Sequence, residues 1–335
     1  MSAELIAWGT FFGTLLAAVL RASAPIILPA LGGLVADLAG SINVALEGIM
    51  LVAAFFGVVA SAYSAIWFPE APLWLHPWVG FAAGISAGML IAGLLAVFHL
   101  ELGADIIVAG IGINILAAGL TVFLLVSITG DKGSTASLAS FAIPPLHIPF
   151  VDSIPVLGVL INGDGFTGHN LIVYLSLLAA PVLAWLLYRT RFGLRLRAVG
   201  ENVDAALAAG ISVKRMQYAA LLLSGLLASL GGIFLSMGYL TLFQADMTSG
   251  RGFLALAAVF LGARRPFGTL IAAVIFGASA VFAARLGMYQ VPSQIMFMIP
   301  PALTIVALVL FNVAQKRKVD RRVTVAAAAL RGGRA

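Results

Sequence analysis

Apolar runs of membrane-span length recur along most of this 335-residue chain, and they constrain its fold more than any other feature. The hydrocarbon core of a bilayer is about 30 Å thick, and a helix of roughly 20 apolar residues crosses it. Hydrophobic residues make up 62% of the chain and charged residues 10%. A soluble domain carries about 25% charged residues. The sequence therefore predicts an all-α, polytopic transmembrane helical bundle that folds as one domain.

The expected spans follow from the apolar runs and the breaks between them. Residues 5–20 and 24–36 are short pieces that form either two spans or one broken helix, because two prolines lie in the second. The remaining expected spans are residues 42–67, 77–98, 105–126, 170–188, 217–240, 269–284 and 294–311, with a short run at 253–261. Ser41 is expected to cap the span that begins at residue 42. About ten spans result if both amino-terminal pieces cross, with eight or nine as the alternatives.

One polar segment, residues 189–216, interrupts the apolar runs and carries six basic residues. The 188 residues before it contain only two, Arg21 and Lys132. Positive charge in a short loop between spans marks the cytoplasmic side of a membrane. Residues 130–169, the longest stretch without a span, are poor in basic residues and are expected on the outer side.

Residues 201–209 within this polar segment predict a short helix. Glu201 and Asn202 suit its amino end, where unpaired N–H groups favour negative charge and small polar caps. Four alanines favour the helix, and Gly210 can end it in the left-handed conformation. A short helix with small side chains at the cytoplasmic surface is expected to dock a soluble partner.

The basic residues also constrain the carboxyl-terminal part. Residues 1–314 are interpreted as the transmembrane domain, and residues 315–335, with seven basic residues, as a cytoplasmic tail. An even number of crossings must then separate the polar segment from the tail. That number is four only if residues 253–261 cross, with Arg264 and Arg265 back at the cytoplasmic face. With ten spans, both ends of the chain lie inside.

No catalytic motif is present. The sequence has no G-x-x-x-x-G-K-[ST] phosphate-binding loop, so this chain is not expected to hydrolyse ATP. Its four histidines are scattered and it has no cysteine, so no metal site is expected. Membrane topology and anionic lipid explain the basic clusters without nucleic acid. The chain is expected to be no enzyme and to hold no cofactor of its own.

Three polar residues at membrane depth are candidates for a substrate pathway, because buried polar groups are costly in a bilayer. Asn43 and Glu47 are four residues apart, which predicts that they share one helix face. Asn114 follows Gly110 and Gly112, which allow close approach of a neighbour or ligand. The structural alternative is hydrogen bonding between helices or, for Glu47, capping of a neighbouring broken helix.

Four sequence segments carry a family resemblance: LRAVGENVDAALAAGISV, GSINVALEGIMLVAAF, GADIIVAGIGINILAAGL and RGFLALAAVFLGARRPFGTLIAAVIFGA. Together they resemble the permeases of bacterial ABC importers for branched-chain amino acids, simple sugars and nucleosides, over roughly residues 20–310. The pattern Asn-x-x-x-Glu-Gly in the second segment is typical of the simple-sugar and nucleoside branch. Arg264 and Arg265 stand where the family more usually has an aromatic residue and asparagine.

The resemblance implies a permease of about ten spans in the bacterial inner membrane, paired with a second homologous permease subunit. It also implies ABC ATPase subunits that bind ATP–Mg, and a periplasmic or lipoprotein substrate-binding protein. Nucleosides are the implied substrates, with simple sugars as the alternative. The residues expected to couple transport to the ATPase are Gly200, Glu201, Asn202, Ala205, Ala206, Gly210 and Ile211.

Two other classes of membrane protein remain open. An ion-coupled secondary transporter would have inverted halves with matched broken helices and midplane carboxylates, for which Glu47 is a lone candidate. A membrane scaffold without a substrate would not need buried polar residues. The secondary-transporter model gives the polar segment 189–216 no role, and the broken helices and buried polar residues argue against a scaffold, so the permease hypothesis is preferred.

Overall fold

The computed structural model describes residues 3–148 and 169–286, together with the isolated positions 162, 302, 305, 306 and 309. Among these residues, seven helices are long and apolar enough to cross a membrane. The prediction of a polytopic helical bundle is confirmed, whereas a count of ten spans is not. Most of the expected span 294–311, the whole tail 315–335 and most of the outer loop after residue 148 lie outside the described residues.

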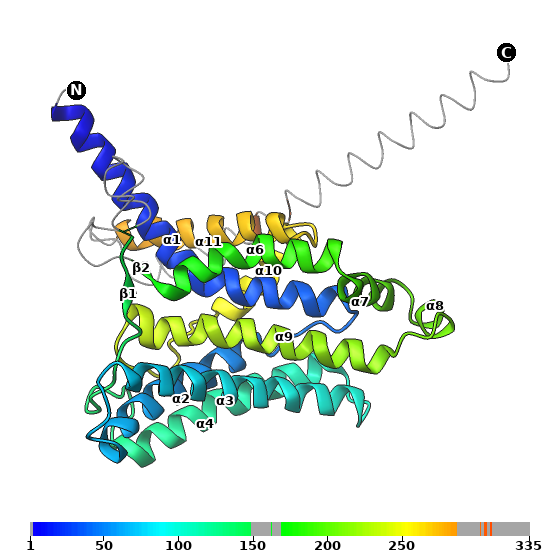
Figure 1. Cartoon of the computed structure of the whole chain (residues 1–335), viewed down its shortest axis with the longest axis horizontal. Helices are drawn as coiled ribbons and strands as arrows, with labels where there is room; N and C mark the ends of the chain where they lie inside the picture. The colour runs from blue at the N-terminus through cyan, green and yellow to red at the C-terminus, as the bar shows by residue number, and fades with distance from the viewer. Residues whose placement is uncertain are drawn as a thin grey trace.

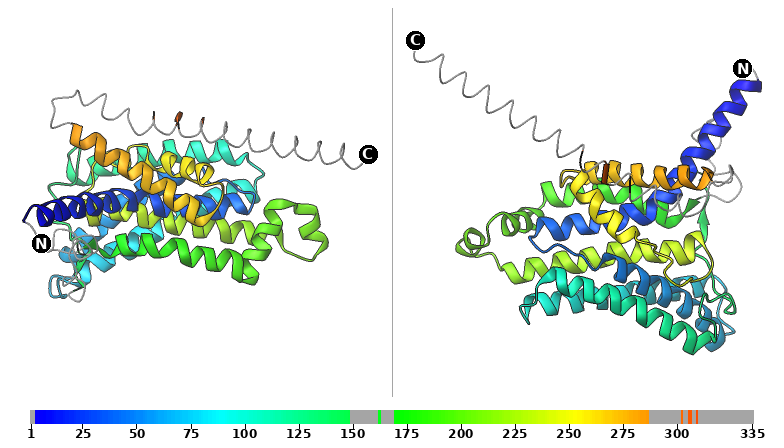
Figure 2. Two further views of the ribbon diagram at one scale, coloured as in Figure 1. Left: turned by 90° about the horizontal axis from the view of Figure 1, so that it is seen from above. Right: turned by 180° about the vertical axis from the view of Figure 1, so that it is seen from behind.

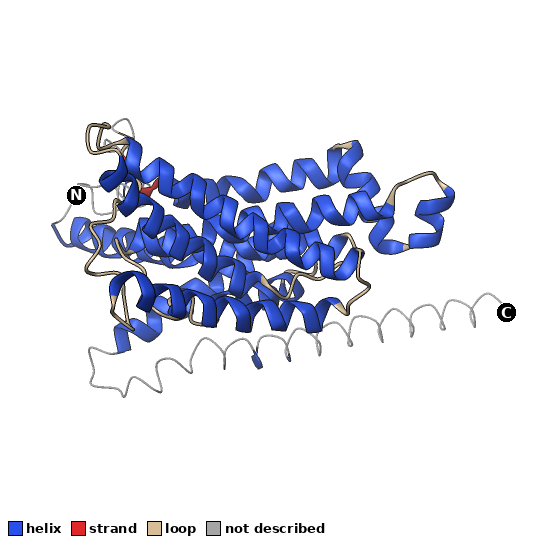
Figure 3. Cartoon of the chain, turned by 90° about the horizontal axis from the view of Figure 1, so that it is seen from below, coloured by secondary structure: helices blue, strands red, loops and turns tan. Residues whose placement is uncertain are grey.

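The helices lie side by side along roughly one common axis (Figure 1), and most loops gather at the two ends of the bundle (Figure 3). The first half contains α1 (Ala3–Leu38), α2 (Leu46–Trp67), α3 (Leu75–Leu100), α4 (Ile106–Thr129), β1 (Pro145–Leu146), β2 (His169–Asn170) and α6 (Leu171–Arg189). The second contains α7 (Arg191–Glu201), α8 (Val203–Ala208), α9 (Val213–Ile233), the π-helix η2 (Phe234–Tyr239), α10 (Arg251–Leu261) and α11 (Pro266–Leu286).

Residues 3–38 form one helix, α1, although Pro25 and Pro29 lie inside it. Of the two possibilities for this region, the structure therefore has the single helix. Figure 2 shows that the amino terminus lies at the end of the bundle opposite α7 and α8. Five described helices, α1, α2, α3, α4 and α6, lie between the amino end and the polar segment. Because this number is odd, the ten-span arrangement that put both chain ends on the side of the polar segment does not hold for the amino end.

The end of the bundle that carries α7 and α8 is rich in cations and is called the basic end below. It holds Arg189, Arg191, Arg195, Arg197, Lys214, Arg215, Arg264 and Arg265. This is the end expected on the cytoplasmic side from its positive charge. At the other end, β1 pairs with β2 in an antiparallel ribbon only two residues long.

The centre of the bundle is built from α1, α2 and α9. Within an 18-residue apolar stretch of each helix, 67% of the residues are buried in α2 and 78% in α9–η2, against 22% in α4. Small residues allow the close approach: Gly232 of α9 lies on the backbone of Met50, and Gly88 of α3 lies on Ser229. The glycine four residues earlier in α3, Gly84, likewise lies on the backbone of Ala53, so the two glycines let α3 pack closely.

Residues 240–264 cross the bundle in two parts. At the end opposite the basic end, the N–H of Thr135 donates to the carbonyl of Phe243 (2.9 Å). At the basic end, Arg264 contacts Asp37 near the end of α1. The 11 residues of α10 cover only about 16 Å, so the non-helical residues 240–250 complete the crossing. The expected crossing by residues 253–261 is thus made by a half-helix and the segment before it.

Candidate coupling segment and membrane-depth site

The short helix expected in the polar segment is present as α8. The Asn202 side chain accepts a hydrogen bond from the Ala205 N–H (2.9 Å) and so caps the amino end of α8. Glu201 was expected to begin this helix but is the last residue of α7. The physical reason is that the extended backbone of Asn202 ends one helix and starts the next (φ −156°, ψ 110°).

Gly210 ends this helical turn as expected. Its φ of 73° is the left-handed conformation that glycine adopts without strain. The Gly210 N–H donates to the Leu207 carbonyl and the Ile211 N–H to the Ala206 carbonyl, both at 2.9 Å. This is the hydrogen-bond pattern that closes a helix at a left-handed glycine.

The segment α7–α8 projects from the basic end of the bundle (Figure 1). Two apolar side chains of α8 face outward, Val203 with 43% and Leu207 with 56% of its surface exposed. Of the expected coupling residues, Ala206 is buried and Ile211 half-buried. The others are exposed: Gly200, Glu201, Asn202, Ala205 and Gly210. The arrangement presents a small apolar surface beyond the membrane spans.

Gly200 connects this projection to the spans. It packs against the end of α1, where a methyl group on Gly200 would overlap the carbonyl oxygen of Leu38 and approach the N–H of Gly40 to 3.1 Å. The absence of a side chain at residue 200 therefore allows the coupling segment to contact α1 directly.

Residues 39–45 form a non-helical linker between α1 and α2, which begins at Leu46. The expectation that Ser41 caps a helix starting at residue 42 is therefore wrong. Asn43 holds the linker instead: its oxygen accepts from the Ala45 N–H (3.0 Å) and its nitrogen donates to Ser224 of α9 (2.9 Å). Asn43 consequently does not share a helix face with Glu47.

The Asn114 side chain of α4 forms hydrogen bonds with backbone groups where α2 begins. Its oxygen accepts from the Gly48 N–H (2.8 Å), and its nitrogen donates to the Val44 carbonyl (2.9 Å). Backbone groups outside a helix need such partners at membrane depth, because lipid offers none.

Glu47 caps a neighbouring broken helix, as the structural alternative proposed. Its carboxylate accepts from the N–H groups of Gly250 (2.7 Å) and Gly252 (2.5 Å) at the start of α10, and the residue is 9% exposed. A carboxylate suits the unpaired N–H groups and the positive dipole at a helix start. Asn43, Glu47 and Asn114 thus gather around one non-helical region, each hydrogen-bonded within the chain. Their contact with a substrate stays a prediction.

An ion pair at the basic end was not anticipated from the sequence. Arg264 contacts Asp37 through Nη2–Oδ1 (2.9 Å) and Nε–Oδ2 (2.7 Å). The Asp37 side chain is 3% exposed and that of Arg264 is 56% exposed. The available signal was an aspartate in the last turn of an apolar helix, where a charge requires a partner.

A second polar contact at the basic end joins α3 to α9. The Glu101 carboxylate lies 2.5 Å from the Lys214 ammonium and 2.9 Å from the Tyr218 hydroxyl. The hydrogen bonds from Lys214 and Tyr218 hold the pKa of Glu101 below its usual range. Among the described residues, no three histidine or acidic side chains gather as a metal site would require.

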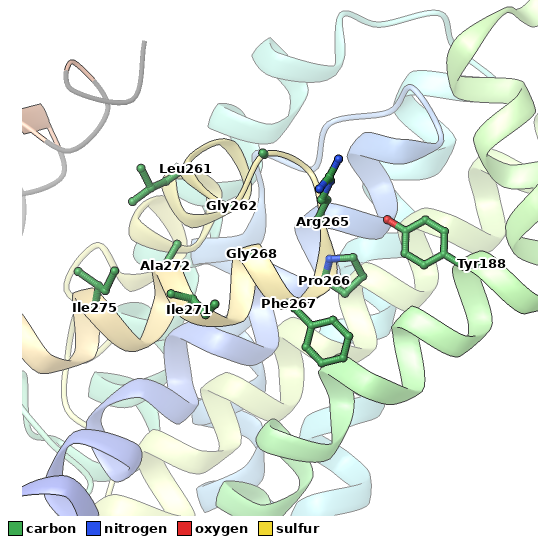
Figure 4. A pocket seen from close by; sticks show the side chains of 11 residues that line it. Tyr188, Leu261, Gly262, Arg265, Pro266, Phe267, Gly268, Ile271, Ala272 and Ile275 are labelled. Carbon is green, nitrogen blue, oxygen red and sulfur yellow. The ribbon is translucent and has the colours of Figure 1, made fainter. Parts of the chain in front are cut away.

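A groove beside the α10–α11 turn has a volume of about 1060 Å³. Apolar residues of α11 form most of its wall, and the Tyr188 hydroxyl points toward Arg265 and Pro266 at its rim (Figure 4). The Arg197 guanidinium lies over the Tyr188 ring, 5.0 Å from its centre. None of the three candidate pathway residues lines this groove.

Comparison with known proteins places this geometry in a family. A family model described as the permease component of the branched-chain amino acid transport system matches residues 15–311. The chain belongs to this permease family. The helical bundle, the projecting segment α7–α8 and the broken crossing at residues 240–264 are therefore features of a transport permease. The family assignment confirms the resemblance inferred from the four sequence segments.

Three relatives illustrate the range of named substrates. The nucleoside ABC transporter permease protein NupC of Lactococcus lactis subsp. cremoris is 36% identical, covering 86% of this chain and 89% of the relative. The guanosine ABC transporter permease protein NupQ of Bacillus subtilis is 35% identical, with 87% and 89% covered. The glucose ABC transporter permease protein TsgB13 of Haloferax volcanii is 28% identical, with 94% and 82% covered.

Proposed function

We propose that this chain is the transmembrane permease subunit of an ABC importer that takes up nucleosides. The observation that carries this proposal is the 36% and 35% identity to permeases named for nucleoside and guanosine transport, over most of each chain. The glucose permease at 28% identity keeps a simple sugar as the second candidate. In this proposal the chain has no cofactor, and partner ABC ATPase subunits bind and hydrolyse ATP–Mg.

Energy reaches the permease through α8. Because this chain has no phosphate-binding loop, closure of the ATPase subunits on ATP must be transmitted by direct contact. The exposed Val203 and Leu207 side chains provide an apolar surface for a groove on the ATPase. The coupling residues are those named from the family resemblance, with Gly200 making the contact to α1.

A second permease subunit completes the membrane part. Lactococcus lactis has two permease proteins named for nucleoside transport, NupC and NupB, which are 36% and 26% identical to this chain. Bacillus subtilis likewise has NupQ and NupP, at 35% and 25%. This pairing of unequal relatives supports a heterologous partner. A substrate-binding protein, periplasmic or lipid-anchored, would deliver the nucleoside at the end opposite the basic end.

The proposed orientation puts the basic end and the carboxyl terminus in the cytoplasm, within the inner membrane of a bacterium. The substrate pathway is proposed to pass the non-helical segments that precede α2 and α10, where Asn43, Glu47 and Asn114 lie. Non-helical backbone at membrane depth is tolerated where it is buried in protein or lines a water-filled cavity. These residues would therefore shape the pathway wall rather than present free hydrogen-bonding groups.

Uptake of radiolabelled guanosine, uridine and ribose, in cells with and without the gene, tests the proposal. We expect deletion to abolish nucleoside uptake and a wild-type copy to restore it. Loss of ribose uptake alone would move the assignment to sugars. Nucleoside uptake that persists after the ATPase partner is inactivated, and that follows an ion gradient, would make the chain a secondary transporter.

The variant Leu207→Asp tests the docking surface separately. A charge at this exposed position of α8 would be buried without a partner in an apolar groove, so we expect ATPase binding and uptake to fall. Leu194→Asp is the matched control, because Leu194 is also exposed (62%) at the basic end but lies on α7. Equal effects of the two variants would contradict docking through α8.

A further inference from the structure

One stretch of chain, residues 37–47, holds both ends of the half-helix α10. At its start, Asp37 contacts Arg264 in the turn that follows α10. At the end of this stretch, the Glu47 carboxylate accepts hydrogen bonds from the N–H groups of Gly250 and Gly252, where α10 begins. Two carboxylates on either side of the linker therefore fix α10 at the basic end and at membrane depth.

The same stretch carries the contact with the coupling segment. Gly200, which directly precedes the last residue of α7, packs on Leu38, which follows Asp37, and on Gly40. Packed contacts thus lead from the projection at the basic end to the end of α1, then to Arg264 and along α10. With a rise of about 1.5 Å per residue, the 11 residues of α10 carry such a displacement about 16 Å into the membrane region.

The Asp37–Arg264 pair is a charged contact within this series of contacts. A buried carboxylate is costly without a partner, and neither residue belongs to the apolar core. Ala263 and Arg264 have φ values of 53° and 56°, a left-handed conformation that is strained for a residue with a side chain. A strained turn that brings a half-exposed cation onto a buried carboxylate suggests a functional constraint.

We propose that the Asp37–Arg264 ion pair is a positioning contact for transport. It ties α10 to the coupling segment, so that displacement of α8 by the ATPase moves the start of α10 at Glu47. This inference rests on the proposed function. Arg264 acts through α10 and does not touch the substrate.

The test uses the complete transporter, with its ATPase and second permease subunits and its substrate-binding protein, in proteoliposomes. Arg264→Gln, Asp37→Asn and the double variant are compared with Arg265→Gln, which removes the neighbouring positive charge from the same turn. The measured quantity is the number of ATP molecules hydrolysed per guanosine transported. We expect basal ATP hydrolysis to stay within twofold of wild type. The ratio should rise at least tenfold in both single variants, rise no further in the double variant, and stay unchanged in Arg265→Gln.

A second readout reports the position of α10 itself. The chain has no cysteine, so Phe253→Cys, at a position on α10 that is 50% exposed, supplies a single reporter. We expect its maleimide labelling rate to change at least threefold when ATP and vanadate trap the ATPase closed. In the Arg264→Gln background the rate should not respond. A purely structural role of the ion pair would not remove this response.

Two results would overturn the inference while leaving the proposed function intact. The first is a wild-type transporter that carries guanosine, with Arg264→Gln and Asp37→Asn variants that keep its ATP-to-guanosine ratio. The second is a reporter that responds equally in the wild-type and Arg264→Gln backgrounds. Failure of the wild-type complex to carry any nucleoside would instead refute the proposed function.

Discussion

Replacing Glu47 with alanine tests whether its carboxylate holds the start of α10. The carboxylate accepts two backbone hydrogen bonds, from Gly250 at 2.7 Å and Gly252 at 2.5 Å, and Glu47 is 9% exposed. A hydrogen bond to a charged group contributes about 1.5–3 kcal/mol, so the pair contributes roughly 3–6 kcal/mol. We expect Glu47→Ala to cost about 3–5 kcal/mol, because water recovers part of the loss at the freed N–H groups.

The assay is the thermal midpoint of the purified protein in detergent, followed by fluorescence of its five tryptophans. The loss corresponds to a drop of about 5–10 °C for a chain of this size. Glu47→Gln keeps one acceptor and should lose about half as much. Glu70→Ala is the control, because Glu70 is an exposed glutamate in the loop between α2 and α3. An unchanged midpoint in Glu47→Ala would refute the capping role, and with lost uptake it would point to substrate contact instead.

Three further perturbations act at the basic end. Gly200→Val should reduce uptake at least tenfold in proteoliposomes, because the new side chain overlaps the end of α1. Wild-type uptake would contradict that contact. Asn202→Ala removes the cap of α8 and should cost about 1 kcal/mol, seen as roughly fivefold faster hydrogen exchange in α8. Unchanged exchange would show that the cap is dispensable. The pKa of Glu101 is lowered by hydrogen bonds from Lys214 and Tyr218, so its contribution to stability is present above the ordinary glutamate pKa of about 4.3 and is lost as pH falls below it. The difference in thermal midpoint between wild type and Glu101→Gln should therefore be constant from pH 8 to pH 5 and shrink at lower pH; a constant difference down to pH 3 would contradict this linkage.

Features set by local chemistry were predictable from the sequence. Hydropathy located the long helices, since apolar length alone decides which segments can cross. The short helix α8 was also predictable, because Asn202 and Gly210 are boundary residues whose preferences are intrinsic to their backbone and side chains. The crossing near residues 253–261 followed from charge parity, although its half-helical form did not.

Features set by distant partners were missed. Residues 42–45 of the linker carry no charge and directly precede an apolar helix, so hydropathy joins them to that helix without a break. Asn43 donates to Ser224 and Asn114 donates to the Val44 carbonyl, while the Gly48 N–H at the start of α2 donates to the Asn114 side-chain oxygen. The partners are too far apart in the sequence for a local pattern to reveal them. The Asp37–Arg264 pair was missed for the same reason, because its two residues are 227 positions apart in the sequence.

The carboxylate at the start of α10 has a consequence for which solutes can pass. In transporters with broken helices, the positive end of a half-helix commonly attracts an anionic group of the solute. Here the chain's own Glu47 occupies that end. The neighbouring Arg251 directs its guanidinium to the carbonyl oxygens of Met247 and Thr248, so the formal charges of Glu47 and Arg251 cancel. We expect this region to exclude phosphorylated compounds and to admit uncharged ones, so that a cell would take up its solute before any phosphate is added.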